Sequence, residues 1–210
     1  LAPGKRLRGL LTLLAAGPGA PALAAACAME MVHAASLVID DMPFMDDAVM
    51  RRGQPALHRV YGEDTATLAA LALLSQAYAV IAADAALPAQ LRADLAVLLH
   101  QALGPQGLVG GQELDLHGEY PAEDMAGVSD MYERKTGVLF IAAAEMGGLI
   151  AGLDAVGLGA LRRFARAAGL AYQVADDLAD IGTATDEVDA DESNIVSTVG
   201  RAESEQLLAG

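Results

Sequence analysis

The stretch Ile39-Asp40-Asp41-Met42-Pro43-Phe44-Met45-Asp46-Asp47-Ala48-Val49-Met50-Arg51-Arg52-Gly53 places four carboxylates and two guanidiniums within fifteen residues. Carboxylates this close repel one another at neutral pH unless a cation lies among them, and ligand sets made only of oxygen suit Mg²⁺. The two arginines suggest an anion beyond that cation. An isolated acidic cluster is also typical of a solvated helix end, so a second cluster is needed to decide.

That second cluster is Gln173-Val174-Ala175-Asp176-Asp177-Leu178-Ala179-Asp180. At 3.6 residues per turn, its three carboxylates and its amide fall on a single helix face. The residues on either side are small or apolar and are not typical of an exposed surface. Two such clusters in one chain favour a site for metal ions and a bound anion over two solvated acidic stripes.

Composition indicates an all-α protein. Of the 210 residues, 54% are hydrophobic and only 4% are aromatic, and the dominant Ala and Leu are strong helix formers. The length suffices for one domain. The net charge of −15 argues against nucleic acid and anionic membranes as partners, although divalent cations would allow a phosphate ligand. The single cysteine, Cys27, excludes an internal disulfide and fits a cytoplasmic location.

Periodicity and turn residues predict helices over residues 21–41, 64–83, 88–103, 123–151 and 158–181. A turn is expected at 17–21, a glycine-rich connection at 104–111 and an acidic loop at 183–194. Residues 65–83 form an uncharged segment that is nearly long enough to span a bilayer. Acidic residues flank this segment, and no basic residue anchors it. We therefore predict a helix buried on most sides of a bundle, and no transmembrane segment.

Two further features carry chemistry. Lys5 and Arg8, in the basic stretch Gly4-Lys5-Arg6-Leu7-Arg8, are three residues apart and would share a helix face that could grip a phosphate. Glu30 and His33 form a Glu-x-x-His pair. A ferritin-like di-metal bundle would need two such pairs and two further glutamates, so this pair alone does not predict one.

In their order along the chain, the motifs resemble those of the trans-isoprenyl diphosphate synthases, the head-to-tail prenyltransferases. The resemblance runs from Gly4 to about Gly200. It rests on the basic stretch, on Asp40-Asp41-x4-Asp46 followed by Arg51-Arg52-Gly53, on Lys135-Thr136-Gly137, and on Gln173-x-x-Asp176-Asp177-x-x-Asp180. The residues around the first motif are similar to those of bacterial geranylgeranyl diphosphate synthases of carotenoid pathways.

The resemblance implies an all-α bundle of the isoprenoid synthase type around an apolar cavity, working as a homodimer. The implied reaction is the Mg²⁺-dependent condensation of isopentenyl diphosphate with an allylic diphosphate, giving geranylgeranyl diphosphate with twenty carbons. It implies three Mg²⁺ ions per active site, with Asp40, Asp46 and Asp176 as ligands and Asp41, Asp47, Asp177 and Asp180 as additional or water-mediated ligands. The residues implied for isopentenyl diphosphate are Lys5, Arg8, His33 and Arg52. Those implied for the allylic diphosphate are Arg51, Lys135 and Gln173, with Thr136 lining the reacting centre.

Two small residues predict product length. Ala35 and Ser36 precede Asp40 by about one turn on the same helix, where members of the family that stop at fifteen carbons tend to carry an aromatic residue. Their size leaves space for a longer product. Ala35→Tyr is therefore predicted to shift the product toward farnesyl diphosphate, and an unchanged product would refute this assignment.

The sequence departs from the family pattern near its end. No lysine follows Lys135, and Glu192 stands where one is expected. We expect a single domain over residues 1–210 that lacks the family's leading helix and its last helices. Either a loop near 183–191 is omitted from the sequence, which we favour, or catalysis is weakened. The alternatives left open are a farnesyl diphosphate synthase, a non-catalytic regulatory subunit of a prenyl synthase, and a class I terpene cyclase.

Overall fold

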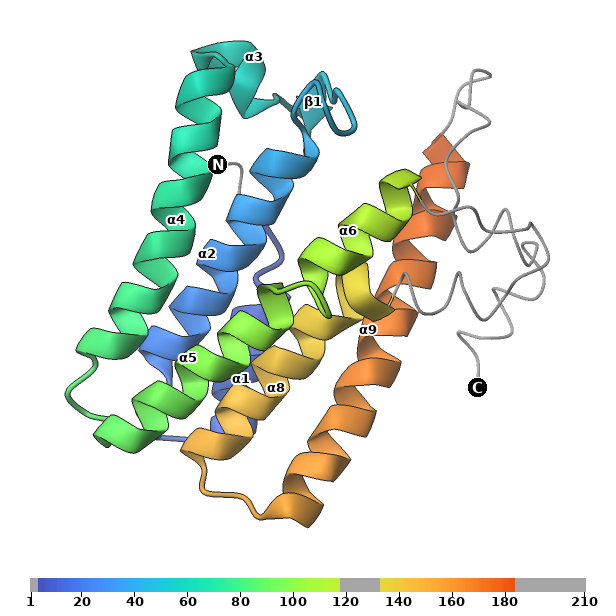
Figure 1. Cartoon of the computed structure of the whole chain (residues 1–210). Helices are drawn as coiled ribbons and strands as arrows, with labels where there is room; N and C mark the ends of the chain where they lie inside the picture. Colours follow the sequence, from blue (N-terminus) through green and yellow to red (C-terminus); the bar gives the residue numbers. More distant parts are fainter. Residues whose placement is uncertain (1–3, 118–132, 184–210) are drawn as a thin grey trace. The chain divides into compact units, whose positions relative to one another are not determined.

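The computed structural model describes residues 4–117 and 133–183, with side chains described as far as residue 175. This part of the chain is helical except for a two-stranded hairpin (Figure 1). The all-α prediction is therefore confirmed. The loop predicted near 183–194, Glu192, the first part of the helix predicted at 123–151, and the side chains of Asp176, Asp177 and Asp180 lie outside the described parts.

The chain divides into two compact units, residues 1–100 with 142–161, and residues 101–141 with 162–210. The first unit holds the N-terminal helices and the hairpin. These are α1 (Leu7–Ala16), α2 (Leu23–Asp40), β1 (Met50–Arg51), β2 (Gln54–Pro55), α3 (Leu57–Tyr61), α4 (Glu63–Ala83) and most of α5 (Ala89–Leu103). Three predicted helices thus appear within three residues of their expected ends. The expectation of a single domain stays a prediction.

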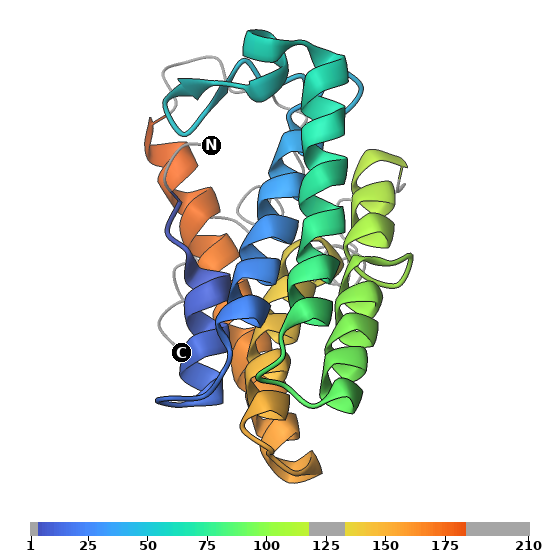
Figure 2. The ribbon, with the colours of Figure 1, turned by 90° about the vertical axis from the view of Figure 1, so that its left-hand side faces the viewer.

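Helix α2 is the centre of the first unit and packs against both α1 and α4, as Figures 1 and 2 show. Four of its alanines, Ala25, Ala26, Ala28 and Ala35, are buried, and such small side chains let neighbouring helices approach closely. At its C-terminal end Ala35, Val38 and Met42 form a buried cluster with Ala66 and Ala70 of α4. Because Met42 is fully buried directly after Asp41, this cluster fixes the point where the acidic loop leaves the helix.

Helix α4 differs from its prediction. Only 22% of the most apolar 18 residues of α4 are buried. The buried residues of this helix are Ala66, Ala70, Ala77 and Ile81. Leu68 is 66% exposed on another face. The expectation that this helix is buried on most sides is therefore wrong for the chain by itself. Length and composition alone would let α2 and α4 cross a membrane, which is weak evidence because core helices pass the same test.

The second unit contains α6 (Leu108–His117), the π-helical turn η1 (Glu133–Gly137), the start of α8 (Val138–Ile150) and most of α9 (Ala155–Thr183). The predicted connection at 104–111 is wrong in its second half, because α6 begins at Leu108. Its glycines suggested a loop, but Gly111 serves packing. A Cβ at Gly111 would lie 2.5 Å from the backbone nitrogen of Lys135, so α6 meets η1 closely only through a glycine.

Candidate active site

A cavity of about 500 Å³ lies in the first unit, against one face of α2. The wall includes one face of α2, whose residues recur after three or four positions, and Asp41 directly after the helix: Glu30, His33, Ala34, Leu37, Val38 and Asp41. The rest of the wall comes from the start of the chain, the hairpin and α3: Gly4, Arg6, Arg51, Arg52, Gln54, Pro55, Leu57, Val60 and Tyr61. The cavity thus combines a cationic side with an apolar one.

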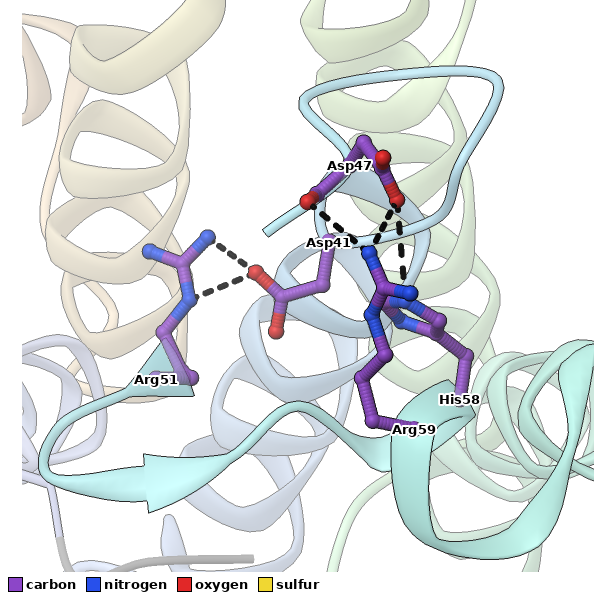
Figure 3. A network of polar contacts seen from close by, with 5 residues as sticks. All are labelled: Asp41, Asp47, Arg51, His58 and Arg59. Atoms are coloured by element: carbon purple, nitrogen blue, oxygen red, sulfur yellow. Dashed lines mark hydrogen bonds and ion pairs between the residues drawn. The ribbon is translucent and has the colours of Figure 1, made fainter. Parts of the chain in front are cut away.

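Asp41 holds Arg51 in place (Figure 3). Arg51 donates from Nε to Oδ1 of Asp41 at 2.7 Å, and its Nη2 contacts the same oxygen. Burial works to lower the pKa of Arg51, but the hydrogen bond and charge of Asp41, together with the charges of Asp40 and Asp46, outweigh it and raise that pKa. Asp41 is only 3% exposed. One oxygen of this buried carboxylate is engaged by the guanidinium, and the expectation of Asp41 as an additional metal ligand stays a prediction.

Asp47 is held on the other side of the loop, by α3. Arg59 donates to Oδ1 of Asp47 at 2.6 Å and to its carbonyl oxygen at 3.5 Å, and Nε2 of the buried His58 lies 4.0 Å from the same carboxylate (Figure 3). The backbone of Asp47 is left-handed, with φ 46°. The carboxylate of Asp47 thus ties the acidic loop to α3, and the expectation of Asp47 as an additional metal ligand stays a prediction.

Asp40 and Asp46, the two ligands expected from the first motif, begin and end a short turn of the acidic loop, and carboxylate oxygens suit Mg²⁺. The backbone N–H of Asp46 donates to the carbonyl oxygen of Asp40 at 3.0 Å, so the loop folds back and brings the two residues together. Within residues 4–117 and 133–175, no group of three or more histidine, cysteine or carboxylate side chains gathers at one point. The two residues fit a hard cation in donor type, and further oxygens must come from a diphosphate, from water or from the second motif.

The residues predicted for isopentenyl diphosphate are only partly brought together. His33 and Arg52 line the cavity, whereas Lys5 is exposed and Arg8 is 7% exposed, and neither is part of its wall. Burial, followed by the charges of Arg8, Arg52 and Arg51, lowers the pKa of His33 to about 3. This imidazole is therefore neutral at pH 7. The structure also brings Arg6 to the wall, which spacing alone did not single out.

The second unit contains three further predicted residues, Lys135, Thr136 and Gln173. Thr136 donates from Oγ1 to Oε1 of Gln173 at 3.0 Å, so η1 is tied to α9, and Lys135 forms an ion pair with Asp115 of α6. A π-helical turn inside a helical segment is often found at functional sites. Sequence reasoning missed Asp115, because no motif marks it and its partner Lys135 lies twenty residues away along the chain.

The two chain-length residues do not face the cavity. Ala35 is 1% exposed and packs against Ala66 and Ala70 of α4, and Ser36 donates its hydroxyl to the carbonyl oxygen of His33 at 3.0 Å. Neither residue is part of the wall of this cavity, and the expectation that they leave space for a longer product stays a prediction. A tyrosine at Ala35 would have to displace α4.

The sequence matches the polyprenyl synthetase family model over residues 1–191. The chain is 45% identical to a geranylgeranyl diphosphate synthase of Pantoea ananas, covering 99% of this chain and 72% of that protein. It is 42% identical to the chloroplastic geranylgeranyl pyrophosphate synthase 3 of Arabidopsis thaliana, over 90% of this chain and 55% of the relative.

Among solved structures, a geranyltransferase from Helicobacter pylori complexed with magnesium and isoprenyl diphosphate has a TM-score of 0.88 and 28% identity. The match covers 99% of this chain and 74% of that one. The helical architecture, the cationic cavity beside Asp40 and Asp46, and these similarities agree: the chain belongs to the polyprenyl synthetase family.

Proposed function

We propose that this protein is a Mg²⁺-dependent prenyltransferase that condenses isopentenyl diphosphate with an allylic diphosphate to give geranylgeranyl diphosphate. The observation that carries the proposal is the cavity on α2, in which Arg6, Arg51 and Arg52 face apolar residues beside the Asp40–Asp46 loop. The arginines can bind a diphosphate, and the apolar residues can surround a prenyl chain. The 45% identity to the Pantoea ananas enzyme supports the twenty-carbon product.

Asp40 and Asp46 would hold Mg²⁺, with Asp176 as the ligand expected from the second motif and three ions per site as in the expected family arrangement. Bound there, the metal neutralises negative charge on the diphosphate leaving group. Arg51, fixed by Asp41, and Lys135, fixed by Asp115, present cations whose directions are set before substrate arrives. Such preorganised charge stabilises the transition state because no reorientation is needed during the reaction.

In the reaction, the allylic carbon–oxygen bond breaks and the diphosphate leaves with the bonding electrons. The double bond of isopentenyl diphosphate attacks the allylic carbon, and a proton is lost to form the new double bond, with the released diphosphate as the base. Ala34, Leu37, Val38 and Leu57 supply the apolar wall that keeps water from the cation. The neutral His33 can donate or accept a hydrogen bond at this wall without adding charge.

We also propose a cytoplasmic homodimer. Its support is the outer face of α4, where Leu68 and Leu71 are 66% and 56% exposed, and Val97 of α5, which is 55% exposed. Burial of apolar side chains of this size against a second surface lowers the free energy of the assembly. Sedimentation should give the mass of two chains, and a monomer at micromolar concentration would contradict this part of the proposal. A role in carotenoid synthesis is proposed from the resemblance alone.

The function is tested by incubating the protein with Mg²⁺, isopentenyl diphosphate and each allylic diphosphate in turn, followed by chromatography of the dephosphorylated products. We expect twenty-carbon products, a loss of at least about a hundredfold in kcat for Asp40→Asn, and no loss for Asp94→Asn. Asp94 is an exposed carboxylate of α5 bonded only to Gln90 among the contacts recorded for it, so it controls for the change of charge. Fifteen-carbon products would indicate a farnesyl diphosphate synthase. Cyclised hydrocarbon from one substrate would indicate a terpene cyclase, and no elongation would fit a regulatory subunit.

A further inference from the structure

His58 is a buried polar residue without a partner. It lies in the short helix α3, and its side chain is 3% exposed. Among the residues that the structure describes, neither Nδ1 nor Nε2 of its ring has a hydrogen-bond partner. A buried polar group that makes no hydrogen bond destabilises the protein, and most such groups are paired. The ring therefore lowers stability in this conformation, and a partner that it meets in another conformation would account for its presence.

The carboxylate of Asp47 is within reach of this ring (Figure 3). Nε2 of His58 lies 4.0 Å from Oδ1 of Asp47, and a hydrogen bond between these atoms requires an approach of about 1 Å. Oδ1 is instead held by Arg59, at 2.6 Å. Both members of that pair are partly in solvent, where an ion pair contributes little to stability. Asp47 can therefore exchange Arg59 for His58 at a small energetic cost.

Asp47 is connected to the turn that carries the expected metal ligands. Its backbone N–H donates to the carbonyl oxygen of Met42 at 3.0 Å, and the N–H of Asp46 donates to the carbonyl oxygen of Asp40 at 3.0 Å. Met42 is fully buried, so the start of this turn is anchored in the core. Because Asp46 and Asp47 are neighbours in the chain, a shift of Asp47 toward α3 moves Asp46 as well.

Charge gives this movement its direction. Without a bound cation the carboxylates of the loop repel one another, which favours an outward position for Asp47. A cation held by Asp40 and Asp46 removes much of that repulsion and lets the loop tighten.

We infer that His58 is a positioning residue for the acidic loop: when Asp40 and Asp46 bind Mg²⁺ with a diphosphate, Asp47 moves onto His58 and accepts a hydrogen bond from its Nε2–H. This inference rests on the proposed function, because it concerns the same metal site. The bond satisfies the buried ring and fixes the turn that joins Asp40 to Asp46. Binding of Mg²⁺ and formation of this bond thus favour each other.

The decisive variant is His58→Leu, which removes both ring nitrogens and keeps a buried side chain. We expect the melting temperature of the metal-free protein to stay the same or rise by about 2–4 °C, because an unpaired buried group is lost. The Mg²⁺ concentration that gives half of the maximal rate should rise at least about tenfold, the loss of one charge-assisted hydrogen bond. His58→Gln should recover most of this loss, because its amide can donate from nearly the position of Nε2. A lower melting temperature with an unchanged Mg²⁺ requirement would show a purely structural role and overturn the inference.

Two further variants separate the neighbouring groups. Arg59→Gln removes the competing partner of Asp47 and should leave the Mg²⁺ requirement unchanged or lower it. His100→Leu replaces an exposed histidine of α5 and should change neither the melting temperature nor the Mg²⁺ requirement. A raised Mg²⁺ requirement in Arg59→Gln, with none in His58→Leu, would assign the loop to Arg59 and contradict the role given to His58.

Nuclear magnetic resonance of protein labelled with ¹⁵N-histidine detects the bond without turnover. On addition of Mg²⁺ with inorganic diphosphate, the Nε2 proton signal of His58, assigned by its absence in His58→Leu, should move downfield. An unchanged signal would overturn the inference. If the signal moves but no allylic diphosphate is elongated, the proposed function fails and the inference stands. If elongation occurs and His58→Leu needs no more Mg²⁺ than the unmodified protein, the inference fails and the proposed function stands.

Discussion

The glycine at position 111 offers a sharp test of how closely the second unit is packed around its reactive residues. An added Cβ would lie 2.5 Å from the nitrogen of Lys135, 2.7 Å from the carbonyl carbon of Arg134 and 2.8 Å from Cβ of Arg134. Two of these atoms are backbone, so no side-chain rotation relieves the contact. In Gly111→Ala, η1 must retreat from α6 by roughly half an ångström to one ångström before ordinary contact distances return.

That retreat has two expected consequences. Overpacking of this kind destabilises by about 1–3 kcal/mol, partly offset by about 1 kcal/mol from replacing glycine with alanine inside a helix. A displacement near 1 Å at Lys135 and Thr136 would lower kcat by about a hundredfold, because both are expected to contact the allylic substrate. The loss of activity should thus exceed what the modest fall in stability can explain.

The assay compares kcat for elongation with the melting temperature, for this variant and for Gly157→Ala. Gly157 lies in α9, and its Cβ would lie 3.2 Å from Cβ of Leu153 and at least 3.4 Å from the other nearest atoms, so its contacts are much looser than those at Gly111. That control should be neutral or slightly stabilising. Wild-type kcat in Gly111→Ala would refute the argument that α6 fixes the position of η1.

Three further predictions follow from the contacts. His33 has a pKa of about 3 in the folded protein and an ordinary pKa near 6.5 in the unfolded chain. Between these values only the unfolded chain is protonated at His33. The stability contributed by the neutral His33 is therefore complete above pH 6.5 and falls as the pH drops toward 3. Urea unfolding of His33→Gln should show about 2 kcal/mol less loss between pH 7 and pH 5 than the unmodified protein. Asp41→Asn leaves Arg51 without its carboxylate and should lower stability by about 1–3 kcal/mol while raising the KM for the allylic substrate. A change confined to the Mg²⁺ dependence would instead identify Asp41 as a metal ligand. Thr136→Val removes the bond to Gln173 and should cost about 1 kcal/mol in chemical unfolding, which Thr136→Ser should recover.

The helices were the most predictable part of the fold. Long Ala-rich segments bounded by glycine and proline predicted α2, α4 and α5 closely, since helix propensity and capping residues act over a few neighbouring positions. The prediction was wrong at the start of α6, where Gly111 is needed for contact with η1. It was also wrong about the burial of α4, because burial depends on which other surface covers a helix and not on that helix's own residues.

The acidic loop shows the same division at the site. Sequence alone determined that carboxylates and arginines of one short motif belong to one site, because residues this close along the chain cannot lie far apart. Only the tertiary structure decided their separate tasks: Arg51 engages Asp41, Arg59 engages Asp47, and the loop brings Asp40 and Asp46 together. Those directions depend on the buried Met42 and on the hairpin and α3 that follow. Which carboxylate meets Arg51 and which meets Arg59 is fixed by packing, and the spacing of the residues along the chain does not encode it.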